Sequence, residues 1–81
     1  GAKEYPEASR RAGREGKVKV QFTIFRNGDV RNIKLLTQTP YPNLNQEAID
    51  AVERSAPFSG FPDSLTQKSV KVILPFRFEL R

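Results

Sequence analysis

The sequence predicts an α+β domain in which one main helix packs on one face of a three-stranded antiparallel sheet, with a short helix before the first strand. Three observations support this fold class. Residues 17–25 and 70–80 alternate apolar and polar side chains with the period of two that is typical of a half-buried strand. A hairpin turn signal follows the first of these stretches. Between the turn and the last strand, apolar residues recur with the period of an amphipathic helix.

Composition limits the function classes. Eighty-one residues make one small domain, in which residues 5–81 are expected to fold and residues 1–4 to be a tail or a remnant of cloning. The chain has no cysteine and no histidine, which excludes disulfides and the usual zinc and nucleophile–base sites. The net charge of +5 favours acidic partners. No apolar run approaches the roughly 18 residues of a membrane span. We expect no cofactor and no metal.

The predicted first helix spans about residues 5–13. Pro6 suits the first helical turn, Glu7 suits its positive end, and Gly13 suits the stop. The stretch buries little apolar surface by itself, so tertiary contacts have to hold it in place.

The hairpin joins two predicted strands. Residues 17–25 put Val18, Val20, Phe22 and Ile24 on one face. Asn27-Gly28 then predicts a two-residue turn, because both residue types accept positive φ. Residues 30–37 return as the second strand.

The main helix is predicted to begin near Asn43, which with Gln46 resembles a capping box; Asn45 is the alternative cap. It is expected to run to about Ala56, before Pro57. The residues expected on its apolar stripe are Leu44, Ala48, Ile49, Val52 and Ala56.

Two further groups of side chains flank this stripe. Three carboxylates lie at helical spacing on the opposite face, where charges are usually solvated: Glu47, Asp50 and Glu53. Nothing places a second functional group beside them, so the sequence predicts no enzyme. Phe58 and Phe61, in the loop after the helix, are expected to cap the core.

The last strand carries the candidate site. Pro75 lies in its middle and has no N–H, so the strand is predicted at the edge of the sheet, in the order two-one-three. Its even-numbered residues are expected to face the helix and pair with strand one. Its odd-numbered residues then direct their backbone groups outward, Pro75 offering only a carbonyl. An open edge of this length is suited to binding an extended peptide as an added strand.

Several short motifs, taken in order, resemble the C-terminal domain of the TonB proteins. They are Tyr5-Pro6, the strand at residues 15–22, the hairpin at 27–30, the helix segment at 47–52, the phenylalanine–proline loop and the finish at 74–78. The resemblance extends from about Tyr5 to Leu80. The tryptophan that some members carry near the end of the helix is absent, and this chain has Phe58 and Phe61 there.

The resemblance implies a periplasmic, non-enzymatic domain of an inner-membrane-anchored energy transducer, coupled to ExbB and ExbD through a preceding N-terminal region. Its implied partner is the TonB box of TonB-dependent outer-membrane transporters for siderophores, metals or vitamins, added as a strand beside the last strand. A weak homodimer through the same edge is a further expectation. The implied partner-binding residues are Tyr5, Pro6, Val70, Lys71, Val72, Ile73, Leu74, Pro75, Phe76, Arg77, Phe78 and Glu79.

Two alternatives come from other classes. A domain like the third domain of TolA shares this general architecture and serves envelope integrity. A nucleic-acid-binding surface is suggested by basic residues and one aromatic on the open face of the sheet: Lys17, Lys19, Phe25, Lys71 and Arg77. The chain lacks the additional β-α unit and the Lys/Arg-Gly-Phe run of an RNA-recognition motif, so we expect no nucleic acid among its partners.

Overall fold

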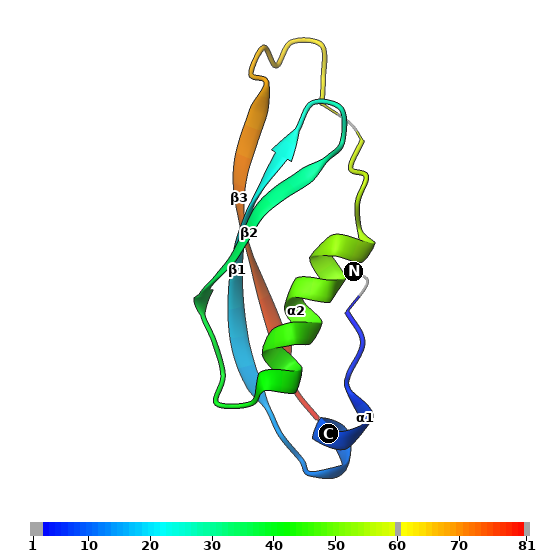
Figure 1. The fold of residues 1–81 in the computed structure, drawn as a ribbon, viewed down its shortest axis with the longest axis vertical. Coiled ribbons are helices and arrows are strands. Elements are labelled where there is room, and N and C mark those ends of the chain that lie inside the picture. The colour runs from blue at the N-terminus through cyan, green and yellow to red at the C-terminus, as the bar shows by residue number, and fades with distance from the viewer. Residues whose placement is uncertain (1–2, 60, 81) are drawn as a thin grey trace.

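The computed structural model describes residues 3–59 and 61–80 and has the predicted order of elements (Figure 1). These are α1 (Glu7–Arg11), β1 (Gly16–Phe25), β2 (Val30–Thr37), α2 (Pro42–Arg54) and β3 (Ser69–Phe78). The strands form one antiparallel sheet in the order β2-β1-β3, and α2 lies along one face of it. The predicted α+β fold with sheet order two-one-three is confirmed. The expectation that Gly1 and Ala2 are a cloning remnant lies outside the described residues.

The core lies between the sheet and α2. Alternate residues of β1 contribute one wall, α2 the opposite wall, and the C-terminal half of β3 closes the side. Its buried apolar residues are Val18, Val20, Phe22, Leu44, Ala48, Ala51, Val52, Phe76 and Phe78. The molecule is long and narrow, at 46 × 19 × 18 Å. Its sheet is covered on one face, so few residues of any strand are fully buried.

The β1–β2 turn differs from the predicted two-residue turn. Gly28 has a φ of +97°, but Asn27 does not adopt positive φ. Gly28 N–H donates to the Phe25 carbonyl at 2.8 Å, and Phe25 N–H donates to the Asp29 carbonyl at 2.8 Å. This is a type I turn followed by one left-handed glycine, the other common way to close a hairpin. Within this turn, therefore, only Gly28 depends on positive φ.

The predicted caps of α2 are wrong. The helix begins at Pro42 with Tyr41 at the N-cap, and no side chain caps it. Proline has no N–H and its φ is already helical, so Pro42 takes the first position and Asn43 falls inside the helix. Asn45 is buried instead, and its side chain bonds both the N–H and the carbonyl of Thr39, at 2.8 and 2.9 Å. It ties the preceding loop to the helix.

The other end of α2 also departs from expectation. The helix stops at Arg54 rather than near Ala56, because the residue before a proline is disfavoured in the helical region. Ala56 is thus lost from the apolar stripe and Ile49 is only half-buried, while Ala51 is buried in the core.

The two loop phenylalanines behave differently. Phe58 packs against the core and stacks on Phe22, with ring centroids 6.1 Å apart, as expected. Phe61 does not join the core; the Arg26 guanidinium lies over its ring at 5.3 Å.

Candidate functional site

The free edge of β3 is the candidate site, and one hydrogen bond shows which way its backbone points. Arg26 N–H donates to the Lys68 carbonyl at 3.0 Å. This pair continues the unbroken β1–β3 register that ends at Phe25 and Ser69. Residues of one parity direct their N–H and C=O groups to the same edge of a strand. The even-numbered residues of β3 therefore point toward β1, and the odd-numbered residues point away from the sheet.

The outward groups come in two sets. Lys71 and Ile73 present N–H and C=O groups on one side of Pro75, and Arg77 presents them on the other. Pro75 has only its carbonyl to offer. The outward N–H groups of Ile73 and Arg77 are separated by about 13 Å of strand. A strand docked here meets donors on both sides of a gap, in the arrangement that the sequence predicts.

The strand is shorter than predicted, since β3 ends at Phe78. Glu79 and Leu80 lie beyond it, and Leu80 N–H donates to a carboxylate oxygen of Glu15 at 2.5 Å. Glu79 pairs with Arg77 at 3.4 Å between exposed side chains. Glu79 is thus placed beside the edge but not in the strand.

Leu74 was expected in the core, and the structure contradicts this. Its side chain is 39% exposed, whereas Phe76 is 9% exposed and Phe78 is fully buried. The physical reason is that α2 packs chiefly over β1 and β2, so the part of β3 around Leu74 has no helix above it. Val70 and Val72, earlier in the strand, are half-buried.

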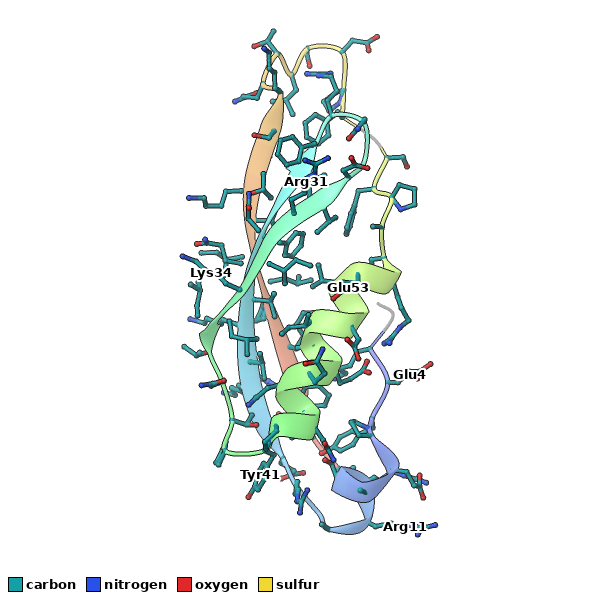
Figure 2. The ribbon with its side chains drawn as sticks, viewed as in Figure 1. Glu4, Arg11, Arg31, Lys34, Tyr41 and Glu53 are labelled. Carbon is teal, nitrogen blue, oxygen red and sulfur yellow. The ribbon has the colours of Figure 1, made fainter. Side chains whose placement is uncertain are left out.

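The open face of the sheet carries basic side chains together with the apolar side chains of Ile73 and Phe25. Ile73 is 54% exposed there. Exposed lysines surround it, and Figure 2 shows Lys34 extending from β2 away from α2. Phe25, the aromatic that a nucleic acid would stack on, already has the Arg31 guanidinium over its ring at 5.4 Å. That contact weighs against a base-stacking platform.

Tyr5 reaches further from the N-terminal segment than its neighbour Pro6. The Tyr5 ring packs edge-on against Phe78, with centroids 5.4 Å apart, and its hydroxyl donates to the Arg14 carbonyl. Burial, and then the negative charge of Glu15, raise the pKa of Tyr5. Tyr5 thus reaches the C-terminal end of β3, and both Tyr5 and Pro6 line a cavity beside α2.

Sequence reasoning missed Lys3, which it placed in a tail. Lys3 Nζ donates to the Arg77 carbonyl, one of the outward groups of the edge. The same ammonium lies 4.9 Å from the centroid of the Phe78 ring. A lysine near the start of a chain carries no signal of such a contact, which joins residues 74 positions apart.

Glu47 is the second surprise, because it was expected on a solvated face. Its side chain is buried and accepts hydrogen bonds from Arg54 Nη2 at 2.5 Å and from Glu4 N–H at 2.6 Å. The hydrogen bond to Glu47 raises the pKa of Arg54. Glu47 therefore anchors the N-terminal segment to α2, and Figure 2 shows Glu4 beside that helix. Glu53 remains exposed, as expected.

The acidic cavity around Pro6 has a volume of about 380 Å³. Glu4, Glu7, Glu47 and Asp50 are among its lining residues. Within residues 3–59 and 61–80, no group of three or more His, Cys, Asp or Glu side chains is arranged to hold a metal ion. Over the same residues, no helix has the length and apolar character needed to cross a membrane.

Comparisons with known proteins agree with this geometry. The sequence model of the family described as Gram-negative bacterial TonB protein C-terminal matches residues 1–80. Protein TonB of Helicobacter pylori is 31% identical over 77 residues, which cover 95% of this chain and 26% of that protein. The chain thus spans about a quarter of that relative's length.

Two solved structures carry the same fold. The solution structure of a Helicobacter pylori TonB C-terminal domain superposes with a TM-score of 0.80 at 29% identity, covering 98% of this chain and 70% of that one. The solution structure of the Pseudomonas aeruginosa TonB C-terminal domain gives a TM-score of 0.79 at 26% identity, covering 96% and 78%. With its sequence, its sheet order and its helix placement all in agreement, this chain belongs to the TonB C-terminal domain family.

Proposed function

We propose that this chain is the periplasmic domain of an inner-membrane-anchored energy transducer. In this proposal it captures the TonB box of an outer-membrane transporter, which adds as a fourth strand beside β3. The observation that carries the proposal is the outward direction of the Lys71, Ile73 and Arg77 backbone groups on an edge strand. Membership of the TonB C-terminal domain family supports the transducer role. The family match also favours this role over a TolA-like one.

Main-chain hydrogen bonds give this mode of binding modest and sequence-tolerant affinity. Each is worth about 1 kcal/mol net, so a strand that forms five or six binds reversibly. Pro75 removes one donor from the middle of the ladder. Such tolerance suits one transducer that serves several transporters.

Charge adds direction to the encounter. Lys71 and Arg77 lie on the open face on either side of Ile73, and the chain carries a net charge of +5. Acidic residues in the incoming segment are attracted to both positions, which raises the association rate more than the affinity.

Force from the membrane enters such a domain through its N-terminal segment, where ExbB and ExbD act through the preceding region in this proposal. Glu4 is bonded to Glu47 on α2, and Tyr5 packs on Phe78 at the end of β3. A pull on this segment is therefore passed to both the helix and the binding strand, and from β3 to the docked TonB box.

The test is a titration of the ¹⁵N-labelled domain with the periplasmic N-terminal peptide of an outer-membrane transporter from the same organism. We expect the largest amide shifts, and new protection from hydrogen exchange, at Lys71, Ile73 and Arg77. Ile73→Pro removes one outward N–H and should weaken binding by about fivefold, because one hydrogen bond of about 1 kcal/mol is lost.

Ile73→Thr is the matched control, because it removes the apolar side chain but keeps the N–H. Unchanged binding by Ile73→Pro, or shifts confined to the acidic cavity beside Pro6, contradicts strand addition at this edge. Unfolding midpoints of both variants, measured in urea, show whether either change acts through stability.

A further inference from the structure

A second cavity, of about 380 Å³, opens beside the free edge of β3. It is lined by Lys3, Leu74, Pro75, Phe76 and Arg77. Leu74 and Phe76 belong to the face that α2 covers elsewhere, but α2 packs chiefly over β1 and β2. The cavity is therefore the place where the apolar face of the sheet reaches solvent, next to unpaired backbone groups.

The position of this cavity matches where a docked strand puts its side chains. Opposed residues on neighbouring antiparallel strands point their side chains to the same face. The partner residues opposite Leu74 and Phe76 therefore point to the side of the cavity. They also form non-hydrogen-bonded pairs with β3, because the outward hydrogen bonds come from the odd-numbered residues. In such pairs the Cα atoms are about 4.5 Å apart and the side chains are in closest contact.

The chemistry of the lining selects the occupant. Leu74 and Phe76 present apolar surface, and the Lys3 ammonium brings positive charge to the cavity. The Arg77 side chain lies on the opposite, open face of the sheet, to which the residues next to the bound side chain point. An apolar side chain fits this surface, and acidic residues next to it in sequence fit the charges. A uniformly polar or basic strand satisfies neither condition.

We propose that this cavity is a side-chain subsite, which takes an apolar residue of an extended, acid-flanked segment docked along β3. The inference rests on the proposed strand addition and adds a specificity determinant to it. Main-chain bonds along the edge accept any strand, whereas this subsite discriminates between strands by the side chain opposite Leu74 or Phe76.

Lys3 closes the subsite when no strand is bound. Its Nζ bonds the Arg77 carbonyl and lies over the Phe78 ring, so its stem forms a wall of the cavity. Because Arg77 is an odd-numbered residue, that carbonyl points outward and is also an acceptor for a docked strand. The incoming N–H and the Lys3 ammonium compete for it, so docking displaces Lys3 and widens the subsite.

The test uses two synthetic peptides with blocked ends and glutamates at both ends. In one, valine and threonine alternate through the middle; in the other, every middle residue is threonine. Valine and threonine are nearly the same size, so the two peptides differ little in volume. A shift of the docked peptide by two residues keeps its valines on the same face of the strand. NMR titration should give the alternating peptide about five- to tenfold tighter binding, from partial burial of a valine side chain.

Leu74→Ala should bring this ratio close to one, because it removes the apolar surface of the subsite. Leu36→Ala is the matched control, since Leu36 is similarly exposed, at 42% against 39%, but lies on the opposite edge strand β2. It should leave the ratio unchanged. Lys3→Met keeps the stem and removes the ammonium; at high salt, where its attraction for the glutamates is screened, this should tighten both peptides about two- to fivefold.

Failure of this inference is distinct from failure of strand addition. If both peptides shift the amides of Lys71, Ile73 and Arg77 equally, and Leu74→Ala changes neither affinity, the edge binds strands but the subsite does not exist. Weaker binding by Lys3→Met at high salt overturns the role of Lys3 as a closing wall. If neither peptide perturbs these amides, the strand-addition proposal fails as well.

Discussion

Gly28 lies where the β1–β2 turn meets the loop after α2, and two independent features of the structure require a glycine there. Its φ of +97° is strained for any residue with a Cβ. A Cβ built there would lie 2.5 Å from the Phe58 carbonyl oxygen, and the Gly28 carbonyl accepts the Phe58 N–H at 2.9 Å. This contact positions Phe58 against Phe22.

We therefore expect Gly28→Ala to lower the free energy of unfolding by more than about 2 kcal/mol. Gly13→Ala is the matched control, because Gly13 has a φ of +68° but nothing within 4 Å of a built Cβ. It should cost only the conformational term of about 1 kcal/mol. Urea unfolding of both variants checks the difference; equal losses would show that the approach of Phe58 does not matter.

Individual side chains were the least predictable part of the sequence. Asn27 and Asn43 both matched strong local signals, yet Asn27 lies in the turn without the predicted positive φ and Asn43 does not cap the helix. In each case the neighbouring residue decides the geometry: Gly28 accepts positive φ without a steric cost, and the φ of Pro42 is fixed in the helical range. Glu47 was assigned to solvent by helical periodicity, but Glu4 and Arg54 cover it. The periodicity of apolar residues describes a single helix and carries no information about another segment that packs over the polar face of that helix.

The strand β3 changes character along its length. Its two-residue period was correctly predicted, and the even-numbered residues do face away from the open side. How deeply each is buried depends on what lies above it, from half-buried Val72, through exposed Leu74, to fully buried Phe78. A single strand thus combines an anchored end with an open middle, and that open middle is the proposed site.

This gradient predicts unequal costs for truncating the strand. Leu74→Ala should lower the free energy of unfolding by less than about 1.5 kcal/mol, because much of its side chain is already in water. Phe78→Ala should cost about 3–5 kcal/mol, since it leaves a cavity beneath Tyr5. Chemical denaturation measures both. Similar losses for the two variants would mean that Leu74 is packed after all.

The molecule as a whole leaves one edge of its sheet open beside a basic face. Two copies can pair through β3, as a peptide would. In an antiparallel pair across a two-fold axis, the outward groups of Lys71, Ile73 and Arg77 lie opposite outward groups of odd-numbered residues in the other copy. The net charge of +5 on each copy opposes this pairing, so it should be weak and strengthened by salt.

Sedimentation over a range of protein concentrations tests this self-association. We expect a shift toward dimer at high concentration that rises with ionic strength and is reduced in Ile73→Pro. Ile73→Thr, which keeps the backbone donor, should retain it. Dimerisation that is equally strong in Ile73→Pro would place the contact elsewhere on the molecule.

The sequence alone was enough to predict the elements, the hairpin, the sheet order and the family. Apolar side chains that recur every two residues indicate strands and those that recur every 3.6 residues indicate helices, and short connections leave few ways to arrange them. It also identified β3 as the edge, since Pro75 lacks an N–H. Only the tertiary structure decided what covers each face: α2 leaves Leu74 open, Lys3 crosses to Arg77, and Glu47 is buried. These contacts join residues far apart in the chain, and local patterns carry no information about them.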